Sequence, residues 1–351
     1  MKDRYVHIDI AKGISICLVA TFHSQLGNFY PSLIEPMGLF RMPLFFLLSG
    51  VFFSWRSEPH YFFTKKFDSL LKPYFVVLFS LLLIDFIFFD EYIGTRWIKI
   101  LYANGPIIDW TPLWFLSHLF LLYVFSYVLF KYFRFHQWPS SIKYIYLISS
   151  ITIGSIFIDS FWIKGISKEI SMSGENLYLP GLPFSLDIIL VTSVFFILGI
   201  MLRSSLISFK PSLFLIAISI IVFYFIQTTP ATVNFNHRMF SYPFLSTLGA
   251  ISGIYLVMSI SYFIQRFKGI SSLLSLCGQS SLFILIFHQM IGRETNNLMI
   301  GLFKPEDSSV IFALIALISS IVVPIYLKTV AEKFNFISFM LLPIRLESKT
   351  K

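Results

Sequence analysis

The chain has 351 residues, of which 56% are hydrophobic and only 13% are charged, whereas soluble proteins carry about 25% charged residues. With a mean hydropathy of +0.77, this composition excludes a soluble globular protein and an intrinsically disordered one. Two cysteines and a net charge of +9 from dispersed basic residues also exclude a disulfide-built secreted scaffold and a nucleic-acid binder.

Apolar stretches follow one another along the chain, and each approaches the roughly 20 residues that a helix needs to cross a membrane. We predict about ten transmembrane helices, near residues 10–28, 37–55, 72–89, 113–131, 142–161, 184–203, 211–228, 243–263, 273–292 and 309–328. The last apolar piece is too short to cross, so we expect a helix at the membrane interface. The sequence thus predicts an all-α, polytopic membrane helix bundle, with one domain over 1–333 and an interfacial C-terminal tail over 334–351.

The positions of the basic residues give the orientation, because Lys and Arg concentrate in cytoplasmic loops. With the N-terminus inside and ten crossings, 19 of the 27 Lys and Arg residues fall in cytoplasmic segments. Both termini are therefore predicted to face the cytoplasm. The first span lacks a small-x-small cleavage site and carries titratable residues, so we expect a membrane helix rather than a signal peptide.

The first span is the most informative, because titratable groups at membrane depth are costly and usually mark function. Lys12 and His23 are eleven positions apart, so on a helix they differ by only about 20° around the axis and lie roughly 16 Å apart along it. Asp9 and several small residues share this stripe. We interpret it as the wall of a functional cavity; a packed interior histidine is the alternative.

Other titratable residues fall in the predicted outer half of the membrane: Arg41, Asp85, His118, Asp187 and His288. His288 is far from obvious loop signals and is, with His23, the better candidate for a functional group. For Asp85 and Asp187, a helix end that meets water explains the sequence equally well.

On the predicted cytoplasmic side, Lys65, Lys66 and Lys72 form a basic cluster that could hold a phosphate-bearing ligand. Ordinary positive-inside topology is the alternative. We find no phosphate-binding glycine loop, no metal-spaced His/Cys group and no nucleophile elbow in the sequence.

Several motifs, taken together, resemble the integral-membrane acyltransferase family three. They are Arg4-Tyr-Val-His-Ile-Asp9-Ile-Ala-Lys12-Gly13 followed by His23, Phe40-Arg41-Met42-Pro43-Leu44-Phe45-Phe46-Leu-Leu-Ser49-Gly50, Lys72-Pro73-Tyr74, Leu113-Trp114-Phe115-Leu116 and Ser281-Leu-Phe-Ile-Leu-Ile-Phe-His288. The resemblance spans most of the chain.

This resemblance implies O-acyl transfer from cytoplasmic acyl-coenzyme A, usually acetyl-coenzyme A, to a hydroxyl of a surface glycan or its lipid-linked precursor. It implies a multi-pass protein of the bacterial inner (plasma) membrane, with acyl-coenzyme A as co-substrate and no permanently bound cofactor. The family's motif of a basic residue, ten positions and a histidine maps onto Lys12 and His23. Its Arg-x-x-Arg motif reads Lys66-Phe-Asp-Ser69 here, which departs from the family pattern.

We therefore expect His23 and Lys12 to be catalytic, with His23 as the base that takes the proton from the attacking hydroxyl. Lys65, Lys66 and Lys72 are the expected donor contacts. The expected acceptor-binding residues are Asp9, Arg41, His118 and His288. Of these, Arg41 and His288 either orient the acceptor or stabilise developing oxyanion charge. A secondary transporter for an anionic or sugar-like solute is the alternative, because midplane polar residues are equally expected there; a noncatalytic scaffold explains the polar stripe less well.

Overall fold

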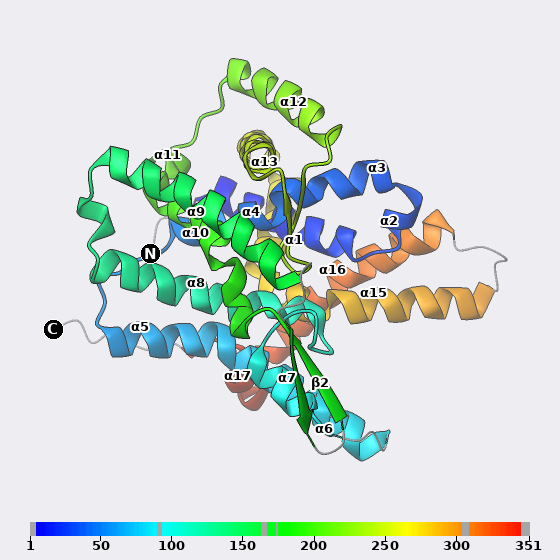
Figure 1. The fold of residues 1–351 in the computed structure, drawn as a ribbon. Helices are drawn as coiled ribbons and strands as arrows, with labels where there is room; N and C mark the ends of the chain where they lie inside the picture. The colour runs from blue at the N-terminus through cyan, green and yellow to red at the C-terminus, as the bar shows by residue number, and fades with distance from the viewer. Residues whose placement is uncertain (1–4, 90–92, 163–166, 173–174, 304–308, 345–351) are drawn as a thin grey trace. The chain divides into compact units, whose positions relative to one another are not determined.

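Helices form nearly all of the regular structure in the computed structural model, which describes residues 5–89, 93–162, 167–172, 175–303 and 309–344 (Figure 1). In these residues, strands occur as two short hairpins, β1 with β2 and β3 with β4. By its internal contacts the chain divides into two compact units. Unit 1 comprises Met1–Phe52, Phe195–Asn234 and Phe240–Val330, and unit 2 comprises Phe53–Val194, Phe235–Met239 and Ala331–Lys351.

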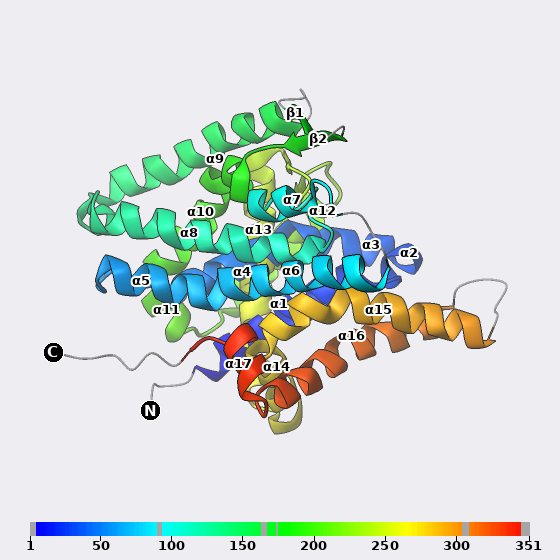
Figure 2. The ribbon, with the colours of Figure 1, turned by 90° about the horizontal axis from the view of Figure 1, so that it is seen from below.

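In unit 1, α1 (Val6–Phe22) is a shared neighbour of several helices. It packs against α4 (Gly38–Val51), α13 (Pro243–Ile264), α14 (Lys268–Gln279) and α15 (Ser281–Phe303), as Figures 1 and 2 let the reader follow. The other elements with residues in this unit are α2 (Leu26–Phe29), α3 (Pro31–Ile34), η1 (Glu35–Met37), α10 (Ile189–Met201), α11 (Arg203–Ile207), α12 (Leu213–Gln227), β3 (Thr232–Asn234), β4 (Met239–Ser241) and α16 (Val310–Ala331).

Helices α1 and α14 approach each other at glycines. A Cβ atom built on Gly13 would lie 1.9 Å from the carbonyl oxygen of Leu274, and one built on Gly278 would lie 2.4 Å from the carbonyl oxygen of Asp9. Small residues allow such backbone approach between membrane helices. The contact therefore holds the segment that carries Asp9 and Lys12 directly against α14.

Unit 2 is built around α8 (Trp114–Lys131), which packs against α5 (Pro59–Lys66) and the π-helical turn η2 (Phe67–Leu71). The turn η2 leads into α6 (Lys72–Phe88), and α6 also packs against α7 (Arg96–Tyr102) and α17 (Asn335–Leu341). The remaining elements are η3 (Thr111–Leu113), η4 (Phe135–Gln137), α9 (Ser140–Trp162), β1 (Ser167–Met172), β2 (Glu175–Pro180) and η5 (Pro183–Ile188).

The helices agree with the predicted all-α polytopic bundle. In the described residues, seven helices are long and apolar enough to cross a membrane, or eight when α14 and α15 are counted as one bent span. Helices α1 and α12, which were predicted to cross, have 17 and 15 residues. The count of about ten spans and the domain boundary at residue 333 stay predictions. The cytoplasmic location of the termini also stays a prediction, and residues 1–4 and 345–351 lie outside the described part.

Two predicted spans are wrong in detail. The span expected near 10–28 ends as a helix at Phe22, where the Ser24 hydroxyl donates to the carbonyl of Thr21 at 2.6 Å. Such local side-chain bonds compete with helix continuation. The span expected near 273–292 is two helices, α14 and α15, that meet at an angle of 85°; the small and polar residues at 278–281 favour this break.

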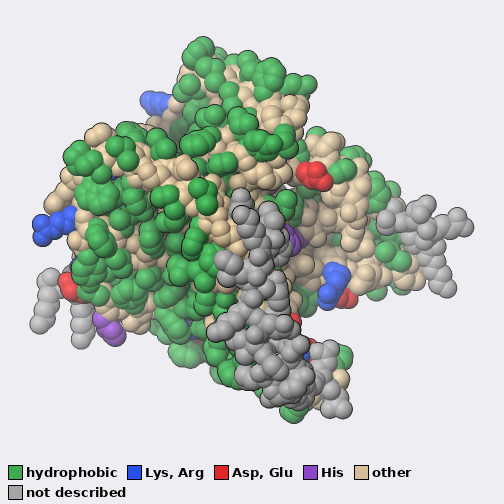
Figure 3. All heavy atoms as spheres, viewed as in Figure 1, with side chains coloured by type: hydrophobic (Ala, Val, Ile, Leu, Met, Phe, Trp, Pro, Cys, Tyr) green, Lys and Arg blue, Asp and Glu red, His purple; other side chains and the backbone are tan. Residues whose placement is uncertain are grey.

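Apolar side chains cover much of the face seen in Figure 3. On α12, the exposed fractions of Leu213 and Phe214 are 79% and 71%. Contiguous apolar surface is rare on proteins surrounded by water and marks contact with lipid or with another apolar surface. We infer that α12 faces lipid, as expected of a membrane protein.

Candidate active site

Helix α1 carries three of the predicted site residues. Lys12 is half-buried, with Nζ 4.3 Å from the centre of the Phe52 ring, and Asp9, one turn earlier, acts on it electrostatically. His23 follows the last turn as the C-cap residue, and its N–H still donates to the carbonyl of Val19. The helical relation between Lys12 and His23 therefore holds, and it keeps them about 16 Å apart along the axis.

His23 lies beside a histidine from another helix of unit 1. The rings of His23 and His288 have centroids 5.2 Å apart, although the two residues are far apart in sequence. His23 is exposed, whereas only 2% of the His288 surface is exposed. The structure thus brings together the two histidines that the sequence singled out, one accessible and one buried.

The hydrogen bonds of His288 define its neutral tautomer. Its Nδ1 lies 2.8 Å from the carbonyl oxygen of Ile284 and 3.1 Å from that of Leu285. A carbonyl oxygen only accepts, so Nδ1 carries the proton and Nε2 carries the lone pair. In the described part of the chain Nε2 has no hydrogen-bond partner. His288 is therefore arranged to accept a hydrogen bond, not to donate one to a developing oxyanion.

Arg41 comes from α4 and completes this cluster. Its guanidinium stacks on Phe22, with Cζ 3.7 Å from the ring centre, and the centroid of the Phe22 ring lies 5.4 Å from that of the His23 ring. The Phe22 ring itself packs against the buried cluster of Leu26, Ile34 and Ala313, of which the first two lie in the short helices after α1. The last turn of α1 and the chain that follows it thereby fix the ring on which Arg41 rests. We call His23, Arg41 and His288 the His–Arg cluster.

His118 lies in unit 2, within another polar network. It is fully buried, with Nε2 2.9 Å from the Thr192 hydroxyl and Nδ1 3.3 Å from the carbonyl of Phe184. Both ring nitrogens are thus engaged with protein atoms, as in a packed interior histidine. Its predicted contact with an acceptor stays a prediction.

The same unit holds a buried ion pair. Arg238 Nε lies 2.8 Å from Asp187 Oδ2, and neither side chain is exposed. Asp187 also accepts from the N–H of Leu182. Nearby, Tyr102 donates to the carbonyl of Gly181; burial, followed by the Asp187 charge, raises the pKa of Tyr102, so its hydroxyl stays a donor.

Backbone strain accompanies this pair. Arg238, Phe184 and Ser185 have positive φ values of 53°, 56° and 54°, a region that non-glycine residues rarely adopt. The ion pair is one interaction that compensates for such strain. The sequence singled out Asp187 but not Arg238; the opposite charges of the two residues were the available signal.

The three lysines predicted to bind the donor lie in different surroundings in unit 2. Lys65 is exposed, with Nζ 5.7 Å from the Tyr61 ring centre, and half-buried Lys66 places Nζ 3.3 Å from that of Tyr123. Lys72 pairs with Asp68 at 2.6 Å and donates to the carbonyl of Leu342 at 2.7 Å. Lys72 is thus already held by a carboxylate and by the C-terminal segment.

Family comparison decides the class of this protein. Residues 5–329 match the family model described as an acyltransferase domain, that of acyltransferase 3. The chain belongs to the acyltransferase 3 family. No curated protein and no solved structure matches it. Together with the apolar helices, the family assignment identifies a membrane acyltransferase and confirms the resemblance noted in the sequence.

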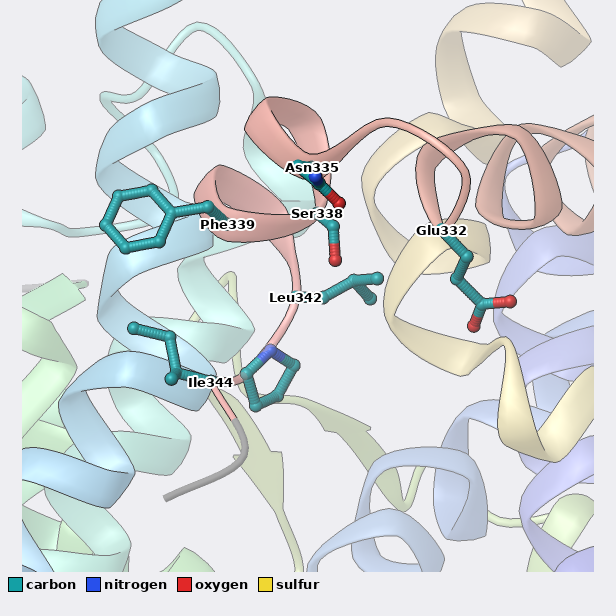
Figure 4. Close-up of a pocket in the computed structure, with 7 residues that line it drawn as sticks. Glu332, Asn335, Ser338, Phe339, Leu342 and Ile344 are labelled. Atoms are coloured by element: carbon teal, nitrogen blue, oxygen red, sulfur yellow. The ribbon is translucent and has the colours of Figure 1, made fainter. Parts of the chain in front are cut away.

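The C-terminal segment of this acyltransferase borders a cavity of about 650 Å³ (Figure 4). Its lining residues are Glu332, Asn335, Ser338, Phe339, Leu342, Pro343 and Ile344. Asp68 fixes the end of this segment by accepting the N–H of Ile344 at 2.6 Å. The described residues contain no group of three His, Cys, Asp or Glu side chains that could hold a metal ion.

Proposed function

We propose that this membrane acyltransferase moves an acyl group from cytoplasmic acyl-coenzyme A to a hydroxyl of a surface glycan or its lipid-linked precursor, and that the acyl group is acetyl. The site of action is the inner (plasma) membrane of a bacterium. The observation that carries the proposal is the His–Arg cluster: an exposed imidazole beside a buried histidine and a buried guanidinium, in a chain of an acyltransferase family.

In the proposed reaction, His23 takes the proton from the acceptor hydroxyl as its oxygen attacks the thioester carbon. The carbon–sulfur bond then breaks, the new ester forms, and the protonated imidazole returns its proton to the departing thiolate, giving free coenzyme A. General-base catalysis suits a neutral imidazole near pH 7. The exposure of His23 supports this role, because the reacting hydroxyl must reach the base.

Other residues receive supporting roles in the proposal. Arg41 and His288 orient the acceptor, and the phosphates of the donor are met either by Lys12 or by Lys65 and Lys66. Lys72, which Asp68 already neutralises, is a weaker donor contact than the sequence suggested. Asp9 acts on Lys12 across one helical turn, which supports a role in holding this lysine rather than direct contact with the acceptor.

Replacement of the proposed base tests the function. His23→Ala in the purified protein is expected to lower the transfer of labelled acetyl from acetyl-coenzyme A to a glycan acceptor by about 10²–10⁴-fold, the usual contribution of a general base. In the wild type, kcat/KM is expected to rise with pH as the imidazole loses its proton, and His23→Gln should lose this dependence.

The matched control is His60→Ala, because His60 is an exposed histidine of unit 2 outside the cluster. It should transfer acetyl at the wild-type rate. A folded, membrane-inserted His23→Ala protein that transfers acetyl at that rate too would overturn the role of His23. Mass spectrometry of surface glycans from cells with and without the protein would identify the acceptor.

A further inference from the structure

The guanidinium of Arg41 is a buried charge without a described counter-ion. Only 6% of the residue surface is exposed, and Nε and Nη1 have no hydrogen-bond partner among the described residues. No carboxylate in those residues forms an ion pair with it. A buried charge is costly unless it is paired and hydrogen-bonded. The face of Phe22 offsets part of this cost but accepts no N–H from the guanidinium edge.

A second unpaired atom lies near this charge. The Nε2 lone pair of His288 is buried and has no hydrogen-bond partner in the described part of the chain. Arg41 stacks on Phe22, and the centroid of the Phe22 ring lies 5.4 Å from that of the His23 ring. His23 in turn lies beside His288, with their ring centroids 5.2 Å apart. Within the described ranges, the His–Arg cluster thus offers N–H donors on Arg41 without acceptors, a lone pair on His288 without a donor, and the accessible imidazole of His23.

We propose that the acceptor of this acyltransferase is anionic, carrying a carboxylate or a phosphate close to the hydroxyl that is acylated. The inference rests on the proposed function and adds the charge of the substrate. The anionic oxygen accepts from Arg41, a neighbouring hydroxyl donates to His288 Nε2, and the reacting hydroxyl faces His23. Charge-assisted bonds of this kind are the strong ones in a site of low polarity.

A ground-state anion accounts for the site better than a transient oxyanion does. An oxyanion exists only during the reaction, so it would leave the Arg41 charge uncompensated in the complex with the acceptor. The two roles also differ in kinetics. A group that stabilises only the transition state changes kcat for every acceptor alike, whereas a group that binds an anion discriminates between acceptors.

Matched acceptors test the inference in the full-length protein. The probes are methyl glucuronide, methyl glucoside and a glucose phosphate ester, each offered with labelled acetyl-coenzyme A. We expect kcat/KM for at least one anionic probe to exceed that for the neutral glucoside by about tenfold or more, the value of a charge-assisted hydrogen bond. A preference for glucuronide indicates a sugar carboxylate, and a preference for the phosphate ester indicates the phosphate of a carrier lipid.

Variants of Arg41 test its role through the ratio of kcat/KM for anionic and neutral acceptors. Arg41→Gln should bring the ratio of anionic to neutral kcat/KM close to one, and Arg41→Lys should keep part of it. Arg293→Gln is the control, because Arg293 is an exposed arginine of the same unit, with 66% of its side chain accessible. It should leave the ratio unchanged. Equal rates with all three probes in the wild type, or a ratio that survives Arg41→Gln, would overturn the inference.

Binding without reaction separates this inference from the proposed function. Thermal unfolding of the purified protein is measured with each probe in the absence of acetyl-coenzyme A. Stabilisation by an anionic probe that Arg41→Gln abolishes supports the anion site even if no probe is acylated, in which case the proposed reaction alone fails. Equal stabilisation by charged and neutral probes, or none by any of them, would refute the anion site.

Discussion

Because α1 and α14 approach each other closely, we expect that a single methyl group added at Gly13 strongly destabilises the protein. In Gly13→Ala, the new Cβ would lie 1.9 Å from the carbonyl oxygen of Leu274, and the carbonyl carbon would be at 2.8 Å. Both obstacles are backbone atoms of a helix, which have no rotamer to change. The helices must therefore separate, or α1 must rotate, before the side chain fits.

The size of the effect follows from the distances. To reach an ordinary contact of about 3.4 Å, the two backbones must move apart by about 1.5 Å. Overpacking of a tight contact costs roughly 1–3 kcal/mol, and rigid obstacles put this site near the upper end. Alanine gains at most about 1 kcal/mol over glycine in a helix. We therefore expect a net destabilisation of about 2 kcal/mol.

Two other glycines provide matched controls. Nothing lies within 4 Å of a Cβ built on Gly27, and a Cβ on Gly292 of α15 would make only an ordinary contact with Ser320 at 3.5 Å. Gly27→Ala should therefore be neutral, and Gly292→Ala neutral or slightly stabilising, because alanine favours the helix. Gly278→Ala, whose Cβ would lie 2.4 Å from a backbone oxygen, should behave like Gly13→Ala.

The assay is thermal unfolding of the purified variants in the same detergent, followed by acetyl transfer below the unfolding midpoint. Gly13→Ala should unfold at a lower temperature than Gly27→Ala. It should also transfer acetyl more slowly, because a displaced α1 carries both Lys12 and His23. If Gly13→Ala unfolds at or above the midpoint of Gly292→Ala, the reasoning from backbone contact is wrong.

Two further predictions concern unit 2. Asp187→Asn leaves the buried Arg238 charge unpaired, so it should destabilise the protein by about 3–5 kcal/mol in a chemical unfolding titration; wild-type stability would mean that the pair is dispensable. Ile344→Pro removes the N–H that Asp68 accepts, whereas Ile344→Ala keeps it. Only the proline variant should show faster amide hydrogen exchange in α17, and equal exchange in both would argue against this anchor.

The helices could be predicted from the sequence because a long apolar segment in lipid must satisfy its own backbone hydrogen bonds, and a helix does so whereas a loop does not. His23 and His288 stood out for the same reason, as titratable residues in apolar surroundings. Their juxtaposition could not be predicted, because it depends on which helices pack together. The backbone contacts at Gly13 and Gly278, which join α1 to α14, belong to this packing and leave no trace in a hydropathy profile.

The buried pair of Arg238 and Asp187 was missed for a different reason. Arg238 lies in the short segment between β3 and β4, which connects the spans predicted near 211–228 and 243–263. The 51 positions that separate it from Asp187 give no periodic signal. Its positive φ is a tertiary property that residue type does not indicate, since arginine is not among the residues that favour this region.

The distance between Lys12 and His23 limits how one molecule of acyl-coenzyme A could contact both residues. They lie on one helix about 16 Å apart along its axis, so they cannot contact the same atom. Acyl-coenzyme A carries its phosphates at one end and its thioester at the other end of a flexible arm. An arm as long as about five extended residues covers this distance. We therefore expect Lys12 to contact the phosphate end of the donor and His23 to contact the thioester end. Helix α1 fixes the distance between the two residues. Lengthening α1 by one turn between the two residues should then lower acyl transfer while leaving coenzyme A binding in place, and loss of both together would contradict this division of roles.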